Sequence, residues 1–356
     1  MKKITLDENV AEIHNSVVFD SPTSAYIQIV EALREFYSHG ASLVSAEVFA
    51  PRSFEPVIAP LLDSNFPVNW ILPLKEVSDN ILAGAHLTAV SGVQPAYFSD
   101  GRGAKGAVYE DSDNSYCRVF GVTADDNVEE ASRHTVSNIN NLEGMLRKCG
   151  FAFSDVARTW FYNDDILSWY PEFNKGRTSA YGQMKVFEGL LPASTGIGAP
   201  NHFGRKCVSG AFAVRSKKGL EPGSQEFVSQ LSSPLQGGAT EYGSSFSRAV
   251  EIVSPKSRRV MISGTASISA DGKTAHADDI SKQVKLTLDV IEGILKSRSM
   301  GFEDTVNAVV YCLEPEYFGY FQAWNKKLNI SYCPAHSIVC REDLMFEIEL
   351  EAAVNL

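Results

Sequence analysis

Three glutamates near the C-terminus alternate with apolar residues, in the segment 346–352 (Phe-Glu-Ile-Glu-Leu-Glu-Ala). Alternation with a period of two predicts a strand that carries Glu347, Glu349 and Glu351 on one face and its apolar residues on the other. A carboxyl group held in apolar surroundings has a raised pKa and can serve as a general acid near neutral pH. A solvated strand face explains most isolated patterns of this kind, and the pattern itself does not choose among the three glutamates.

Three arginines with aromatic neighbours suggest a site for a small acidic molecule: Arg158, Arg177 and Arg248. Period two places Arg158, Trp160 and Tyr162 on one face of a predicted strand, and Tyr242 shortly precedes Arg248. Guanidinium groups bind carboxylates through paired hydrogen bonds, so this set suits an acidic substrate. For any one of these arginines alone, a helix cap or a surface ion pair is the better explanation.

Other chemistry-bearing motifs are missing from the sequence. Gly196-Ile-Gly198 lacks the spacing of a nucleotide-binding loop, and no GxSxG elbow of a serine hydrolase is present. The histidines show no metal-ligand spacing, and the six cysteines are scattered without a CxxC pair, which is typical of reduced thiols in a cytoplasm. We therefore expect no metal and no organic cofactor.

The composition narrows the class of partner. A formal net charge of −11 over 356 residues argues against a nucleic-acid partner, which favours a basic surface. The N-terminal residues lack the apolar stretch of a signal peptide, and no window has the roughly 18 apolar residues of a membrane span. We expect a cytoplasmic protein that binds neither nucleic acid nor membrane.

The elements that must position these residues come from a duplicated module. Glu143-Gly144 matches Glu292-Gly293, and Phe153 matches Phe302, both at an offset of 149 residues. A fixed period over this length indicates two homologous domains. Each copy has the pattern strand, helix, strand, helix, strand. Strands are expected at 117–122, 156–162, 259–266, 305–312 and 346–352, and helices at 131–149, 168–181, 279–296 and 316–328.

The rest of the chain is less regular. Residues 219–247 are rich in Gly, Ser, Pro and Gln and are interpreted as the connection between the domains. Residues 1–80 have the element order of half a module, with helices at 25–39 and 54–63 and strands at 42–49 and 67–73. They are interpreted as an N-terminal extension with the element order of a partial third copy, and no residue identities support that copy.

At this point the sequence resembles the RidA/YjgF family and, more specifically, the chorismatase family, in which two such modules are fused. The resemblance covers residues from about 85 to the end and is carried by these motifs: Ala157-Arg-Thr-Trp160, Phe173-x-x-Gly-Arg177, Pro192-Ala-Ser-Thr-Gly-Ile-Gly-Ala199, Tyr242-Gly, Phe246-Ser-Arg-Ala249, Ile262-Ser-Gly-Thr-Ala266, Cys340-Arg-Glu-Asp-Leu344 and Glu347-Ile-Glu349. It implies an α/β (α+β) fold of tandem RidA/YjgF-like (chorismate-mutase-like) modules, each a mixed sheet backed by helices. The expected domains are residues 81–220 and 221–356, after the extension 1–80.

The resemblance also implies an activity, the conversion of chorismate with release of pyruvate. Glu347 matches the catalytic acid of the family, which would protonate the methylene carbon of the enolpyruvyl ether. Arg158, Arg177 and Arg248 are expected to hold the substrate carboxylates, with Trp160, Tyr162 and Tyr242 beside them. Gly264 and Cys340 match the branch that forms a hydroxybenzoate, most simply 3-hydroxybenzoate, although a small buried filler is the ordinary role of a free cysteine.

Three alternatives remain open at this stage. One is a chorismate hydrolase that forms a dihydroxycyclohexadiene carboxylate, another a RidA-like enamine or imine deaminase, and the third a non-catalytic aromatic-acid-binding protein. His336 stands where the deaminases carry an arginine, and Leu313 stands at a position that is basic in many relatives. RidA modules assemble as trimers, so a fused pair either forms a homotrimer or buries the same surfaces within one chain.

Overall fold

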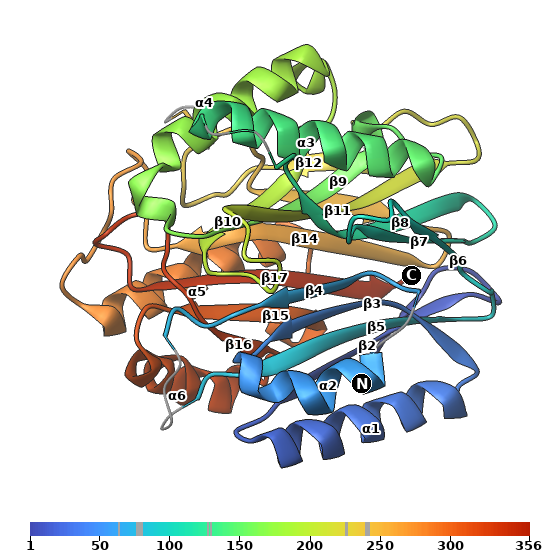
Figure 1. The fold of residues 1–356 in the computed structure, drawn as a ribbon, viewed down its shortest axis with the longest axis horizontal. Helices are drawn as coiled ribbons and strands as arrows, with labels where there is room; N and C mark the ends of the chain where they lie inside the picture. Colours follow the sequence, from blue (N-terminus) through green and yellow to red (C-terminus); the bar gives the residue numbers. More distant parts are fainter. Residues whose placement is uncertain (63–64, 76–80, 127, 129, 225–226, 239–242) are drawn as a thin grey trace.

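Three mixed sheets, each backed by two helices, make up the chain in the computed structural model, which describes residues 1–62, 65–75, 81–126, 128, 130–224, 227–238 and 243–356 (Figure 1). The first sheet has the order β1-β2-β5-β3-β4. Its strands and helices are β1 (Lys2–Thr5), β2 (Ala11–Val18), α1 (Pro22–Ser38), β3 (Ala41–Phe49), α2 (Glu55–Leu62), β4 (Val68–Ile71) and β5 (Gly84–Ser91).

The second and third sheets repeat this order with one more strand at the edge. The second sheet, β10-β9-β11-β8-β7-β6, contains β6 (Ala96–Ser99), β7 (Lys105–Glu110), β8 (Asn114–Thr123), α3 (Ala131–Lys148), β9 (Val156–Asn163), α4 (Tyr170–Gln183), β10 (Ala193–Gly198) and β11 (Cys207–Ser216). The third, β12-β13-β14-β17-β15-β16, contains β12 (Val228–Leu231), β13 (Ala249–Val253), β14 (Ser257–Ala266), α5 (Ile280–Lys296), β15 (Thr305–Cys312), α6 (Phe318–Leu328), β16 (Cys333–His336) and β17 (Phe346–Asn355).

The first sheet therefore has the topology of a whole module without its outermost strand. Among the strands of the described residues, each sheet has one parallel pair, which lies at one end: β3–β4, β9–β10 and β15–β16. The expected domain boundary near residue 80 falls between β4 and β5 of the first sheet. The interpretation of residues 219–247 as a connection alone was wrong at β12, which pairs with β13 and buries Val228 and Leu231.

The sheets face one another, and the helices lie outside them (Figure 1). Each module has its own apolar core between sheet and helices, while a fourth core joins the inner faces of all three sheets. At its centre the ring of Phe49 contacts those of Tyr162 and Tyr311, one residue from each module. The positioning of any site between modules thus depends on a single shared core.

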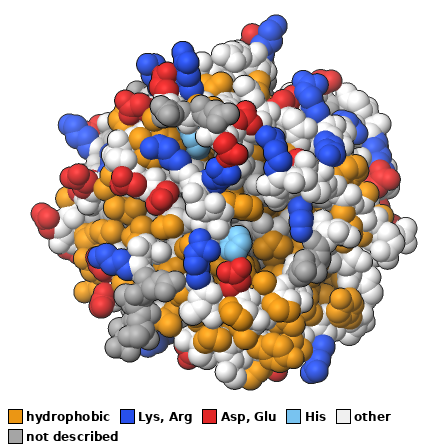
Figure 2. All heavy atoms as spheres, viewed as in Figure 1, with side chains coloured by type: hydrophobic (Ala, Val, Ile, Leu, Met, Phe, Trp, Pro, Cys, Tyr) orange, Lys and Arg blue, Asp and Glu red, His pale blue; other side chains and the backbone are white. Residues whose placement is uncertain are grey.

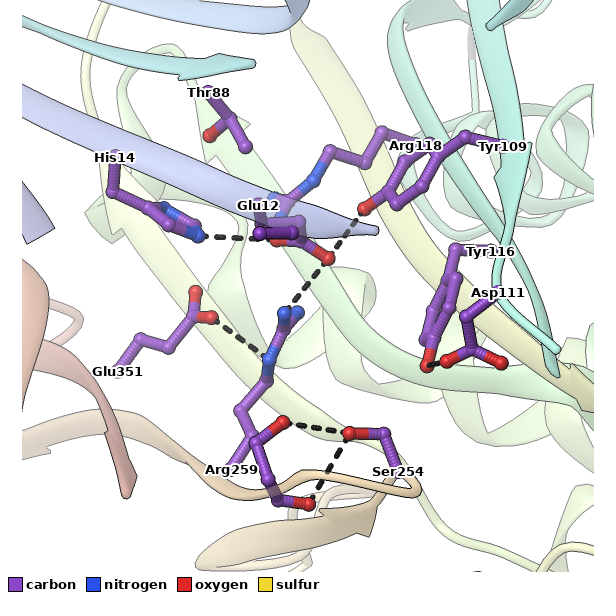
Figure 3. Close-up of polar contacts among 12 residues, drawn as sticks. Glu12, His14, Thr88, Tyr109, Asp111, Tyr116, Arg118, Ser254, Arg259 and Glu351 are labelled. Carbon is purple, nitrogen blue, oxygen red and sulfur yellow. Dashed lines mark hydrogen bonds and ion pairs between the residues drawn. The ribbon is translucent and has the colours of Figure 1, made fainter. Parts of the chain in front are cut away.

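A buried ion-pair network also joins the three modules (Figure 3). Glu12 on β2 accepts a hydrogen bond from the Tyr109 hydroxyl at 2.6 Å and lies 3.1 Å from Arg118 Nη2 and 2.7 Å from Arg259 Nη2. Burial opposes ionisation, but the two guanidinium groups hold the pKa of Glu12 well below its ordinary value. Glu12, His14 and Glu351 could together reach one cation, but Arg259 already pairs with both carboxylates, so this cluster is an ion-pair network between modules.

The outer surface mixes charge of both signs. On the face drawn in Figure 2, Lys and Arg side chains are scattered among Asp and Glu rather than gathered in one patch. Among the described residues, no helix has both the length and the apolar character needed to cross a bilayer.

Candidate active site

The three alternating glutamates lie on β17, in the middle of the third sheet between β14 and β15. Ile348 and Leu350 point into the core under α5 and α6, as the alternation predicted. Glu347, Glu349 and Glu351 face the other modules and are only 5%, 5% and 7% exposed. A solvated strand face is thereby excluded, and each buried carboxyl group needs a physical account.

The partners of the three carboxyl groups differ. Glu349 Oε2 lies 2.9 Å from Arg158 Nη2, and its Oε1 accepts a hydrogen bond from Trp160 Nε1 at 2.9 Å. Glu351 Oε1 lies 3.2 Å from Arg259 Nε. Within the described part of the chain, no donor or cation pairs directly with the carboxyl group of Glu347. Glu347 is the one of the three that is left for chemistry.

Glu347 lies in a cavity of about 540 Å³ between the second and third modules. One wall comes from α4 and β10, and the other comes from β14, β17 and the segments that precede β13 and β17. The lining includes six polar or conformationally special residues: Tyr170, Arg177, Arg248, Gly264, Cys340 and Glu347. A cavity of this size accommodates a molecule of one ring with several substituents.

The surroundings of Glu347 favour its protonated form. Burial, followed by the negative charge of Glu349, raises the pKa of Glu347 to about 8, against the opposing effect of Arg158 and Arg248. In most molecules this carboxyl group is therefore protonated at pH 7. A protonated carboxyl group that faces a cavity is suited to general acid catalysis.

Gly264 makes room for that carboxyl group. The pairing of β14 with β17 shifts register between Ile262 and Thr265, so Gly264 lies in a β-bulge beside the start of β17. A Cβ atom at this position would lie 2.1 Å from Glu347 Oε1 and 3.2 Å from Thr195 Oγ1. The observed conformation of Glu347 thus requires glycine at position 264.

Cys340 lies on the loop before β17 and contributes a neutral thiol to the cavity wall. Burial, followed by the charge of Glu347, raises the pKa of Cys340 to about 11. The hydroxyl group of Tyr170 lines the same part of the cavity, and burial raises the pKa of this hydroxyl group. At neutral pH this thiol is not a nucleophile, and it fills space next to the carboxyl group.

Two guanidinium groups face the cavity around a shared aromatic ring. Arg177 donates from Nη2 to Asn174 Oδ1 at 2.7 Å, and its Cζ lies 5.7 Å from the centre of the Phe246 ring. Arg248 donates from Nε and Nη2 to the carbonyl oxygen of Gly237 at 2.9 and 2.8 Å, and its Cζ also lies 5.7 Å from the Phe246 ring. Both side chains are almost fully buried, so their orientation is set before a ligand arrives.

The other residues that the sequence suggested lie elsewhere or outside the described chain. Arg158 and Trp160 hold Glu349 beneath the cavity rather than lining it. The Tyr162 hydroxyl lies 3.3 Å from that of Tyr311 in the shared core. Tyr242 lies outside the described residues.

Sequence reasoning missed Tyr170, Thr195 and Phe246 as parts of the site. Thr195 and Phe246 lie inside the motifs that carry the family resemblance, so these motifs could have indicated that both residues belong to the site. Tyr170 has no such signal, because only the fold brings the start of α4 next to the loop before β17.

Comparison with known proteins gives relatives that are named chorismatase or 3-hydroxybenzoate synthase. No family model matches the chain. A chorismatase of Streptomyces hygroscopicus is 26% identical over 253 residues, which cover 65% of this chain and 70% of the relative. A 3-hydroxybenzoate synthase of the same organism is 28% identical over 224 residues, or 56% of this chain and 64% of that relative.

A solved structure agrees with these relatives in fold. The crystal structure of a chorismatase superposes with a TM-score of 0.65 at 19% identity, and the match covers 87% of this chain and 93% of that one. The expected tandem arrangement of RidA/YjgF-like modules, each a mixed sheet backed by helices, is thus confirmed. The chain is a homologue of the chorismatases and shares their fold.

Proposed function

We propose that this protein is an enzyme that converts chorismate to a hydroxybenzoate, most simply 3-hydroxybenzoate, and pyruvate. The observation that carries the proposal is Glu347, a buried and protonated carboxyl group without a direct partner in the described chain, which faces a cavity that also holds two guanidinium groups. The relatives named chorismatase and 3-hydroxybenzoate synthase support this reaction over others that a carboxylic acid could catalyse.

Chorismate is a dianion with one carboxylate on its ring and one on its enolpyruvyl ether. Arg177 and Arg248 offer one guanidinium group to each carboxylate, which matches the charge of the substrate. Holding both ends fixes the ether relative to Glu347, and such positioning is a large part of the catalysis of a one-substrate reaction.

The reaction begins when Glu347 protonates the methylene carbon of the enolpyruvyl group. The adjacent ether carbon becomes an oxocarbenium-like centre, and the bond between the ether oxygen and the ring carbon weakens as the carbonyl group of pyruvate forms. The C4 hydroxyl oxygen of the substrate then attacks the ring carbon and gives an epoxide-like species as pyruvate leaves. Ring opening with loss of one ring proton restores aromaticity, so the proton that Glu347 donated is balanced and no co-reactant is consumed.

Attack by water instead would give the dihydrodiol. Gly264 lets Glu347 lie against the cavity wall. Cys340 fills the space beside this carboxyl group, which leaves less room there for a water molecule. His336, whose Nε2 lies 3.1 Å from the carbonyl oxygen of Leu313, stands where the imine deaminases carry an arginine. These features favour the hydroxybenzoate.

We also propose that the three modules of one chain take the places of three RidA subunits, with boundaries after Ser91 and Ser216, where the sheets end. The inner faces that a RidA trimer buries between subunits are then buried within one chain. We further propose a cytoplasmic location, where the six free cysteines stay reduced.

The test is to incubate purified protein with chorismate, to follow pyruvate with a coupled assay and to identify aromatic acids by chromatography. We expect equimolar pyruvate and 3-hydroxybenzoate, both abolished by Glu347→Gln. A dihydrodiol in place of the hydroxybenzoate would refute the assigned product. No pyruvate from folded protein would refute the proposed function.

A further inference from the structure

We infer that Glu349 is a positioning residue for Glu347. Its negative charge, which Arg158 and Trp160 hold in place, keeps Glu347 protonated, and the hydrogen bonds that extend from this group keep Glu347 directed into the cavity. This inference rests on the proposed function and assigns to Glu349 a role that differs from substrate binding.

The geometry excludes a direct role for Glu349. Glu347 and Glu349 lie two residues apart on one face of β17, about 6.6 Å along the strand. Both oxygens of Glu349 are engaged at 2.9 Å, one by Arg158 and one by Trp160, and the side chain is 6% exposed. Glu349 can therefore neither bind a substrate carboxylate nor supply a proton to the cavity.

A continuous set of hydrogen bonds connects Glu349 with the wall against which Glu347 rests. Arg158 Nη2 donates both to Glu349 Oε2 and, at 2.5 Å, to Thr195 Oγ1. The same hydroxyl oxygen accepts the backbone N–H of Gly264 at 3.1 Å. Because Gly264 is the residue whose missing side chain leaves room for Glu347, this network fixes the position of the acid as well as its surroundings.

The charged and titratable groups around Glu347 come from several elements. They are Glu349 on β17, Arg158 on β9, Tyr170, Lys175 and Arg177 on α4, Arg248 before β13, Cys340 and Arg341 before β17, and, farther off, Glu47 on β3 and Tyr311 on β15. Glu349 is the anion that acts on Glu347 most strongly, while Arg158 and Arg248 act in the opposite direction. Without Glu349, Arg158 would lose the carboxylate with which it pairs.

The test is Glu349→Gln, which keeps the shape of the side chain and removes its charge. The rate of pyruvate release requires protonated Glu347, so it falls as pH rises through the pKa of that group. We expect this fall to move to lower pH by about one unit, which makes the variant about 5-fold slower than the wild type at pH 8, about 10-fold slower at pH 9 and much closer to it near pH 6. Rates measured from pH 5 to 9.5 would give the profile.

The matched control is Glu351→Gln, which removes a buried, arginine-paired carboxylate from the same face of the same strand, two residues farther from Glu347. We expect its pH profile to match the wild type even if the folded state is less stable. An unshifted profile in Glu349→Gln, or equal shifts in both variants, would overturn the inference. If Glu349→Gln does not fold, Trp160→Phe removes one donor to Glu349 and should shift the profile in the same direction by less, and an unshifted profile there would also overturn it.

Titration of the enzyme without substrate keeps this inference separate from the proposed function. Carbon-13 labelling of glutamate side chains, with the Glu347 signal assigned by Glu347→Gln, would report its protonation by NMR. We expect a lower midpoint in Glu349→Gln than in the wild type. That result without turnover of chorismate would refute the proposed function alone, whereas equal midpoints would refute the positioning role.

Discussion

Replacement of Gly264 by alanine tests whether the position of the Glu347 carboxyl group sets the rate. The new Cβ atom would lie 2.1 Å from Glu347 Oε1, whereas ordinary contacts begin at 3.4 Å, so the carboxyl group must retreat by about 1.3 Å. A displacement of about 1 Å at a reacting group can cost about 100-fold in rate. We therefore expect Gly264→Ala to lower kcat for pyruvate release by about 100-fold, with a small change in the free energy of unfolding, because the group that moves is the end of a flexible side chain.

The assay is coupled pyruvate release at saturating chorismate, with urea unfolding measured in parallel. Gly196→Ala is the matched control, since Gly196 also lines the cavity but its added Cβ would meet nothing closer than Phe173 Cε1 at 3.9 Å. Its loss of rate should be at least about 10-fold smaller. Equal losses in the two variants, or a kcat for Gly264→Ala within about 3-fold of the wild type, would refute the argument from the position of Glu347.

Four further predictions follow from the same contacts. The double variant Gly264→Ala/Cys340→Ala should recover part of the lost rate and form the dihydrodiol, because the smaller residue at position 340 makes room for the displaced carboxyl group and for a water molecule. Chromatography would detect the dihydrodiol, and an unchanged product would contradict this prediction. Arg177→Met and Arg248→Met should each raise KM for chorismate about 10- to 100-fold, since each removes a charged hydrogen-bond donor. An unchanged KM in steady-state kinetics would mean that the replaced arginine does not bind the substrate. The pKa of the Glu347 carboxyl group rises on folding from 4.5 to about 8, so the free energy of unfolding of the wild type falls by up to about 5 kcal/mol as the pH rises between these values. Glu347→Gln removes this group and should therefore stabilise the protein at alkaline pH but not below pH 4.5. Thermal unfolding at pH 4.5 and 8.5 measures this, and equal gains at both pH values would contradict it. Glu12→Gln should cost about 3–5 kcal/mol in urea unfolding, because two buried guanidinium groups lose their shared anion; a loss below about 1 kcal/mol would mean that the network does not hold the modules together.

Much of the fold can be predicted from the sequence because its signals are local. The alternation in 346–352 correctly separates the face of Ile348 and Leu350 from the face of the glutamates, and the offset of 149 residues correctly indicates repeated modules. The first module was only half recognised, because β5 lies beyond the boundary expected at residue 80 and no residue identities mark the copy. The short edge strand β12 was hidden in a segment whose composition is typical of loops.

The choice among the three glutamates could not be made from the sequence, because it depends on contacts between distant residues. Glu349 is excluded from acid chemistry by Arg158, which precedes it by 191 positions, and Glu351 is engaged by Arg259. Arg158 was selected for its charge and its aromatic neighbours, and both features occur equally in a residue that binds substrate and in one that binds a buried glutamate. Glu12 had no local signal, because its partners belong to the other two modules.

The most direct test of the central claim, that Glu347 protonates the enolpyruvyl methylene carbon of chorismate, is the reaction in D₂O with mass analysis of the pyruvate at early times. The account predicts pyruvate with one deuterium in its methyl group, formed by the wild type and not by Glu347→Gln. Pyruvate released by Glu347→Gln at the rate of the wild type, or pyruvate without deuterium, would contradict it.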